Sequence, residues 1–216
     1  MSRPEVKSAP CFGASPVRTD EDGEFAFVPS GRTHLLVESI PLKFGGAGED
    51  THFLTVRSLY DWGLLTSAGG IQFDALRLRE APTIVQLVDN QTGWGMEPLP
   101  LAAALSLLRL KGGEIVPGSN CHGYTFAGSS FWIDDEAAER LRGDSCFVET
   151  KREHAEIAVF RNRGKVVHSC RLMRSGPLVR YIGKAGIGAI LGAESEVEAA
   201  RGNRFSEVEY LKIALP

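Results

Sequence analysis

The chain of 216 residues is 43% hydrophobic and 24% charged, which is typical of a folded globular protein and excludes a disordered or fibrous one. Its formal net charge is -3 and its sequence pI is about 6.0, so Lys and Arg are not in excess. Phosphate neutralisation needs clustered basic residues, and we therefore expect no nucleic-acid partner.

Residues 1–22 mix Pro, Ser, Gly and charged residues with little periodicity, and we expect a flexible arm there. The first 16 residues have no apolar run suited to a signal peptide, and no stretch of the chain reaches the ~20 apolar residues of a membrane span. We expect no membrane partner, and a cytoplasmic protein or one that is exported by a route independent of a signal peptide.

The next part, residues 23–98, is predicted to be a mainly β N-terminal region. Apolar or alternating runs predict strands at 25–28, 34–40, 71–78 and 83–88, with a turn at Pro29-Ser30-Gly31 between the first two. Residues 53–65 fit either a strand or a short helix. The Gly-rich stretch 43–50 lacks the Lys-Ser/Thr ending of a phosphate-binding loop, so we interpret it as a plain loop.

The third part, residues 99–216, begins with an Ala- and Leu-rich run at 99–111 that predicts a buried helix. A turn then leads to Cys121, where a second helix is predicted to begin. Acidic residues followed by Arg over 134–142 predict a further helix with a solvated face. Strands are predicted at 155–161, 165–173, 178–182 and 208–213, the first two joined by the hairpin turn Asn162-Arg163-Gly164, with a helix over 194–201.

Cys121 is the candidate nucleophile, because it stands at the predicted start of a helix. The exposed amides of a helix N-terminus favour thiolate over thiol. His168, on the second strand of the predicted hairpin, is the candidate general base. Both residues also have structural interpretations, Cys121 as a small buried apolar residue and His168 as a hydrogen-bonded core histidine.

The remaining cysteines and histidines do not suggest a metal site. The four cysteines are too sparse and irregular for a disulfide framework, and no two of them have C-x-x-C spacing. His34, His52 and His154 are scattered along the chain. We predict no metal and no cofactor, and structural roles for Cys146 and Cys170.

The helix motif Asn120-Cys121-His122-Gly123, the strand at 156–160 and the later His168-Ser169-Cys170 resemble the papain-like cysteine peptidases and amidases of bacteria, the NlpC and CHAP groups. The resemblance covers about residues 115–190. It implies an α+β fold, in which a papain-like core packs the Cys-bearing helix on an antiparallel sheet, preceded by the mainly β region.

The sequence departs from that family at three points. Ala155-Glu156 stands where the family often has Gly-Asp, and Cys170 stands where Gly is common. No polar residue after His168 clearly matches the third catalytic position, which orients the imidazole. Tyr181 is the candidate for that role, although the nearby Arg180 and Lys184 would repel an imidazolium.

These residues predict a cysteine hydrolase that cleaves an amide bond in a peptide, an isopeptide or a peptidoglycan stem through a thioester acyl-enzyme. Cys121 and His168 are the expected catalytic residues. The Cys121 amide and the Asn120 or His122 side chain are the expected oxyanion donors. The alternatives are an acyltransferase using the same Cys-His site, and a non-catalytic interaction module with a decayed site. The expected partner is a peptide-like or protein substrate, and the oligomeric state stays open.

Overall fold

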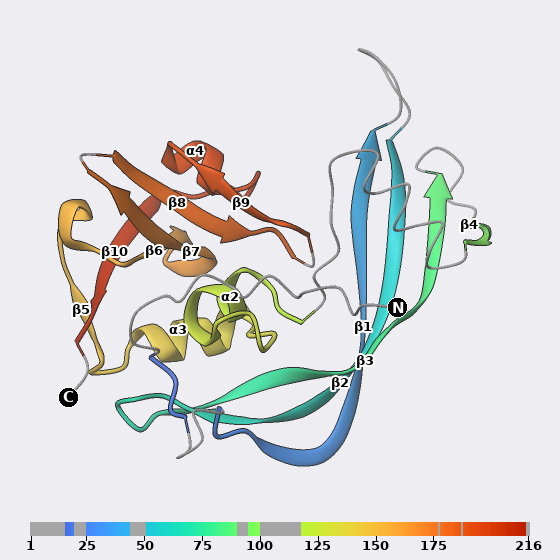
Figure 1. Ribbon diagram of the computed structural model, residues 1–216, viewed down its shortest axis with the longest axis horizontal. Helices are drawn as coiled ribbons and strands as arrows, with labels where there is room; N and C mark the ends of the chain where they lie inside the picture. The colour runs from blue at the N-terminus through green and yellow to red at the C-terminus, as the bar shows by residue number, and fades with distance from the viewer. Residues whose placement is uncertain are drawn as a thin grey trace, which may run out of the picture.

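The computed structural model describes residues 16–19, 25–43, 51–89, 95–99, 118–176, 178–186 and 188–214, of which 38–43, 51–56, 81–89 and 95–99 are described by their backbone alone. Within these residues ten strands form two antiparallel sheets, accompanied by three short α-helices (Figure 1). The predicted α+β papain-like core is therefore wrong, because strand dominates the described chain and is divided between two sheets. The predicted helix at 99–111 and most of the predicted loop at 43–50 lie outside the described residues.

The first sheet has the strand order β1-β2-β3-β4. Its strands are β1 (Val28–Lys43), β2 (Thr51–Thr66), β3 (Gln72–Asp89) and β4 (Gly95–Leu99). The turn predicted at Pro29-Ser30-Gly31 is instead a bulge within β1, where the pairing with β2 shifts between Pro29 and Arg32. A bulge inserts a residue and bends a strand without ending it, so these strands are much longer than predicted.

The second sheet has the strand order β5-β10-β6-β7-β8-β9. Its strands are β5 (Phe147–Glu149), β6 (Ile157–Asn162), β7 (Lys165–Ser175), β8 (Leu178–Lys184), β9 (Ile190–Ala193) and β10 (Glu207–Ile213). The predicted β6–β7 hairpin is confirmed. Its turn residues Arg163 and Gly164 have φ values of 51° and 78°, the positive values that a two-residue hairpin turn requires.

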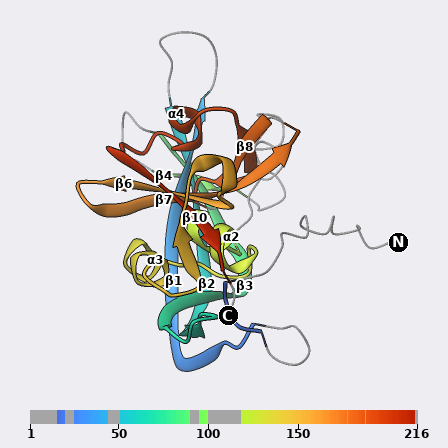
Figure 2. The same cartoon turned by 90° about the vertical axis from the view of Figure 1, so that its left-hand side faces the viewer.

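Two helices lie between the sheets and one lies on the outer face of the second sheet. Helices α2 (Cys121–Ala127) and α3 (Asp135–Arg142) run between the second sheet and the curved part of β2 and β3, in both views (Figures 1 and 2). The short helix α4 (Glu196–Ala199) packs with the opposite face of the second sheet, and a 3-10 turn, η1 (Arg152–His154), precedes β6. No helix of the described chain is long and apolar enough to cross a membrane.

One hydrophobic cluster joins the three predicted parts of the chain. It contains Val17 from the predicted arm, Leu65 and Phe73 from the first sheet, and Phe126 and Ile157 from the third part, all buried. The predicted boundaries at residues 22 and 98 stay a prediction, but across them the described residues share a single core. This core fixes α2 between the two sheets.

Candidate functional site

The start of α2 is fastened by the side chain of Asn120. Its Oδ1 accepts hydrogen bonds from the Gly123 amide at 2.9 Å and the Ile133 amide at 3.2 Å, and its Nδ2 donates to the Ile133 carbonyl at 2.6 Å. A Cβ at Gly123 would overlap the carbonyl oxygen of Phe131, so only glycine lets this segment lie against the helix. Asn120 is thus the N-cap that makes Cys121 the first helical residue.

Strand β7 brings two polar residues to this helix. It pairs with β6 from Lys165 to Arg171, but with β8 only from Arg171 onward, and α2 contacts both β7 and β8. The ring of His168 lies beside that of its cross-strand partner Phe160, with centroids 5.5 Å apart, and it also interacts with the Cys121 thiol at the start of α2. The next residue, Ser169, contacts His122 of α2.

His122, the residue after Cys121, is held at both ring nitrogens. Its Nδ1 lies 2.8 Å from the Ser169 hydroxyl, and its Nε2 lies 3.0 Å from Oδ1 of Asp135, the first residue of α3. Both oxygens can accept, so the ring can carry two protons. Burial alone would lower the pKa of His122, but the charge of Cys121 and the hydrogen bond to Asp135 outweigh it and raise the pKa to about 10.

His168 is buried, with 1% of its surface exposed, and keeps one ring nitrogen without a partner. No group of the described chain hydrogen-bonds to its Nε2. Gly183 of β8 lies beside that nitrogen, because a Cβ built there would be 3.6 Å from Nε2 and 3.0 Å from the Cβ of Cys170. Nε2 is thus a buried ring nitrogen beside Gly183, and the hydrogen-bonding interaction of His168 is with the Cys121 thiol.

The thiol of Cys121 is partly exposed and unusually acidic. Burial alone would raise its pKa, but the charges and hydrogen-bonding groups of His122 and His168 outweigh burial and lower the pKa well below the usual range of a thiol. The thiol pKa values of the other two described cysteines are raised rather than lowered. Burial raises the pKa of Cys146 to about 11 and raises that of Cys170 further, so both stay thiols at neutral pH.

The structure brings Cys121, His122 and His168 together but does not bring Tyr181 to His168. The Tyr181 hydroxyl lies 2.8 Å from that of Tyr210 and 3.4 Å from Oε1 of Glu196, the first residue of α4. The Asn120 amide is engaged with Ile133, as the N-cap requires. The catalytic and oxyanion roles of these residues stay a prediction.

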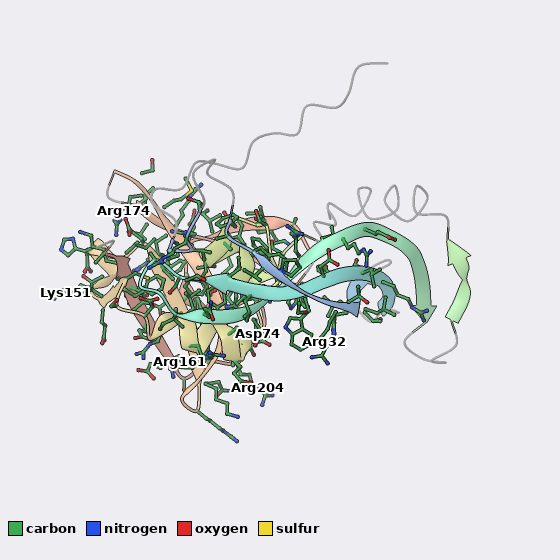
Figure 3. All side chains as sticks on the ribbon, turned by 90° about the horizontal axis from the view of Figure 1, so that it is seen from below. Arg32, Asp74, Lys151, Arg161, Arg174 and Arg204 are labelled. Atoms are coloured by element: carbon green, nitrogen blue, oxygen red, sulfur yellow. The ribbon has the colours of Figure 1, made fainter. Side chains whose placement is uncertain are left out.

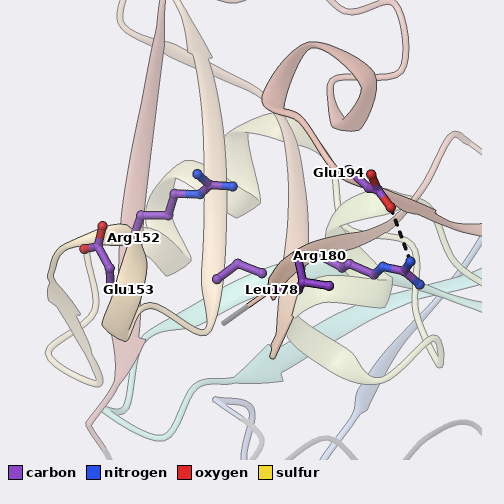
Figure 4. A pocket seen from close by; sticks show the side chains of 6 residues that line it. Arg152, Glu153, Leu178, Arg180 and Glu194 are labelled. Carbon is purple, nitrogen blue, oxygen red and sulfur yellow. Dashed lines mark hydrogen bonds and ion pairs between the residues drawn. The ribbon is translucent and has the colours of Figure 1, made fainter. Parts of the chain in front are cut away.

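The two basic residues that were expected near the imidazole have other partners. Arg180 forms an exposed ion pair with Glu194 at 3.2 Å. Together with Arg152, Glu153 and Leu178 this pair lines a depression of about 390 Å³ on β8 and η1 (Figure 4), which contains none of the predicted catalytic residues. Lys184 is fully buried, and its Nζ donates to the carbonyl of Ser119, two residues before Cys121.

Three residues of this site were missed in the sequence. Asp135 was assigned to a solvated helix face, and it is indeed exposed, but it binds the imidazole of His122 from there. Ser169 follows His168 within the predicted strand at 165–173, and Lys184 lies two residues after the predicted strand at 178–182, with no pattern that would distinguish either residue. An acid following an N-cap Asp is the one available signal, because it places a carboxylate at the exposed start of α3.

Comparisons with protein-family models, with curated proteins and with solved structures find no match for this chain. Among the described residues, no group of three or more His, Cys, Asp or Glu side chains is arranged to hold a metal ion. The chemistry of the site therefore has to be inferred from its own geometry.

Proposed function

We propose that the chain is a cysteine hydrolase that cleaves an amide bond, in a peptide, an isopeptide or a peptidoglycan stem, through a thioester acyl-enzyme. The observation that carries the proposal is a half-buried cysteine at the capped start of α2, whose pKa is lowered by the charges and hydrogen-bonding groups of His122 and His168. A low thiol pKa supplies the nucleophile that acyl transfer needs.

The two imidazoles have different roles in the proposed mechanism. His122 has both ring nitrogens bound to oxygen, so it serves as a fixed cation that stabilises the thiolate. A general base must have a ring nitrogen that can take up a proton. His168 interacts with the thiol through a hydrogen-bonding group and, unlike His122, is not hydrogen-bonded to oxygen at both ring nitrogens, so we assign it the proton transfers.

In the proposed reaction the Cys121 sulfur attacks the amide carbonyl carbon after its proton has passed to His168. The C–N bond breaks as His168 returns that proton to the leaving amine. A water molecule then gives a proton to His168 and attacks the thioester, the C–S bond breaks, and the acid is released. The Cys121 backbone amide remains our candidate donor to the oxyanion.

The first test is acylation of Cys121 by 4-nitrophenyl acetate, followed by intact-mass spectrometry. We expect a transient acetyl adduct on Cys121 that forms faster than on free cysteine and decays to acetate. General acid–base catalysis contributes ~10²–10⁴-fold, so His168→Ala should slow acylation by at least about 100-fold. Cys146→Ala is the matched control and should acylate normally, because Cys146 is buried away from the histidines.

Amide cleavage is then tested with a peptide mixture, in which wild type should create new termini that are absent with Cys121→Ala. An adduct that persists in water but passes to an added amine would contradict hydrolysis and support the acyltransferase. A Cys121 that reacts no faster than free cysteine would contradict both enzymes and support the non-catalytic module.

A further inference from the structure

A groove of about 220 Å³ lies beside the candidate site, where the first sheet meets the start of α3. It is lined by aromatic and acidic side chains from β1, β2, β3 and the segment before α3, among them His34, Trp62, Asp74, Leu76, Trp132 and Asp134. Figure 3 shows Asp74 and Arg32 at the junction of the first sheet with the rest of the molecule. The groove is separate from the depression around Arg180.

The two carboxylates of the groove are held in place, and each has an oxygen to spare. Oδ1 of Asp74 accepts from the indole N–H of Trp62 at 2.9 Å, and Oδ1 of Asp134 accepts from the Ala137 amide at 2.7 Å. Within the described chain, no hydrogen bond or ion pair reaches either Oδ2. A fixed carboxylate with a vacant oxygen binds a cation without first losing side-chain freedom.

The aromatic walls favour the same kind of ligand. Cations are attracted to the face of an indole ring, and the planar guanidinium of Arg also stacks on it. The Arg32 guanidinium already covers one face of Trp62, 5.5 Å from the ring centroid, so a ligand would meet the part of the indole that lines the groove. Trp132 provides a second indole, whose ring centroid lies 6.3 Å from that of Tyr60.

One short segment connects the groove to Cys121. Trp132 and Asp134 line the groove, whereas the residues that alternate with them serve the candidate site. Ile133 binds the N-cap Asn120 through its backbone, and Asp135 binds His122. The same four residues therefore contribute both to the groove and to the contacts around α2.

We propose that the groove binds an arginine side chain of a peptide substrate, with the guanidinium between the Trp62 and Trp132 indoles and hydrogen-bonded to the free oxygens of Asp74 and Asp134. The proposal rests on the proposed hydrolase function and names the class of substrate that Cys121 receives. Two aspartates and two indoles match the charge, the planarity and the several N–H donors of a guanidinium.

The test measures binding in the full chain carrying Cys121→Ala, so that no turnover occurs. The probes are the peptide acetyl-Ala-Arg-Ala-amide and its citrulline analogue, which has nearly the same shape but no charge. Tryptophan fluorescence is the readout, since Trp62 and Trp132 are two of the three tryptophans of the chain. We expect the arginine peptide to bind about tenfold more tightly than the citrulline peptide.

Asp74→Asn and Asp134→Asn, each in that background, should abolish this preference. Asn still accepts the internal hydrogen bond, so both variants should keep their circular dichroism spectrum and thermal midpoint. Glu149→Gln, which removes an exposed carboxylate of β5 outside the groove, is the control and should keep the preference. Equal affinities for the two peptides, or a preference that survives both substitutions, would overturn the proposal.

This measurement separates the groove from the hydrolase. If Cys121 forms no acyl-enzyme but the charge preference is present and depends on both aspartates, the proposed function fails and the guanidinium site stands. If wild type cleaves arginine and citrulline peptides with equal kcat/KM, the hydrolase stands and the groove is not its substrate site.

Discussion

The two histidines near Cys121 differ in what their ring nitrogens can do. The fully buried ring of His122 donates to Ser169 from one nitrogen and to Asp135 from the other, so neither nitrogen can accept the thiol proton. A buried imidazolium that is hydrogen-bonded on both sides keeps its charge over a wide pH range. The lowered pKa of the Cys121 thiol thus depends in part on the charge of the next residue in the sequence.

Removing the His122 charge should therefore raise the pKa of the thiol. In wild type the pKa of Cys121 is well below the usual thiol range, so the thiolate persists in mildly acidic solution. In His122→Gln the effect of burial remains and the main opposing charge is gone. We expect the midpoint of iodoacetamide alkylation against pH to reach or exceed ~8.5, the value of a free thiol, with a rate at pH 6 at least tenfold lower.

Asp135→Asn should produce a smaller rise in the same midpoint, because the imidazolium loses an anionic acceptor but remains. Glu136→Gln removes the next exposed carboxylate of α3, which forms no hydrogen bond or ion pair with His122, and should leave the midpoint unchanged. A His122→Gln chain that alkylates with the wild-type midpoint would show that His168 alone lowers the thiol pKa.

At the scale of elements, strand β8 determines how much space there is beside the His168 ring. Gly183 faces the imidazole across the point where β8 leaves β7, and the space there is too narrow for a methyl group without adjustment. Position 183 thus limits the size of the side chain that can lie beside Nε2 of His168. A polar side chain that would orient the ring from this strand has no room.

Gly183→Ala should accordingly impair catalysis more than folding. The new Cβ would lie 3.0 Å from the Cβ of Cys170, so Cys170 or strand β8 must shift, and it would lie against Nε2 of His168 at 3.6 Å. We expect acylation by 4-nitrophenyl acetate to fall at least tenfold, because small misplacements of a base are costly. Overpacking should lower the free energy of unfolding by about 1–3 kcal/mol.

Gly192→Ala on the neighbouring strand β9 is the matched control. A Cβ at Gly192 meets Ile182 at 3.5 Å, an ordinary contact, and neither glycine has a positive φ. Urea unfolding and acylation rates should both stay close to wild type in this variant. Equal effects of the two substitutions would mean that Gly183 has no special relation to His168.

The elements that could be predicted from the sequence are those that local chemistry determines. The β6–β7 hairpin follows from Arg163-Gly164, and the start of α2 follows from the capping residue Asn120. The long strands of the first sheet could not be predicted. The signal Pro29-Ser30-Gly31 is the same for a turn and for a bulge, and only the pairing of β1 with β2 decides between them.

The site and the fold class could not be predicted for the same reason, because both depend on contacts between segments that are far apart in the sequence. The contact between His122 and Asp135 exists because the segment at 131–133 folds back onto α2, which depends on Gly123 and on the shared core. The papain-like expectation rested on a motif around Cys121 and on two following strands. A motif of that length carries no information on how the preceding strands associate, and these form the first sheet, on the other side of the helices (Figure 1).

At the scale of the whole molecule, a polar link joins the two sheets beside their common core. Asp144, which follows α3, accepts hydrogen bonds from the Ser67 hydroxyl at the end of β2 and from the Cys146 amide at 2.9 Å. The carboxylate is 3% exposed. Burial alone would raise its pKa, but these hydrogen bonds outweigh burial and lower the pKa of Asp144.

Asp144→Ala should therefore destabilise the whole molecule. It leaves the Ser67 hydroxyl and the Cys146 amide buried without their acceptor, and each such group costs about 1–3 kcal/mol. We expect the free energy of urea unfolding at pH 7 to fall by about 2–4 kcal/mol. Ser145→Ala removes an exposed hydroxyl 3.3 Å from the same carboxylate and should cost less than about 1 kcal/mol.

The lowered pKa of Asp144 also makes its contribution to the free energy of unfolding depend on pH. A carboxyl whose folded pKa is lowered stabilises the protein fully above its ordinary value of 3.8, and this stabilisation is lost as the pH falls through the folded value. The difference in unfolding free energy between wild type and Asp144→Ala should thus be constant from pH 7 to 5 and shrink in more acidic solution.

Because both sheets share one core, tryptophan fluorescence and circular dichroism should report a single common transition in wild type. Separate transitions would mean that the sheets fold independently and that Asp144 does not couple them.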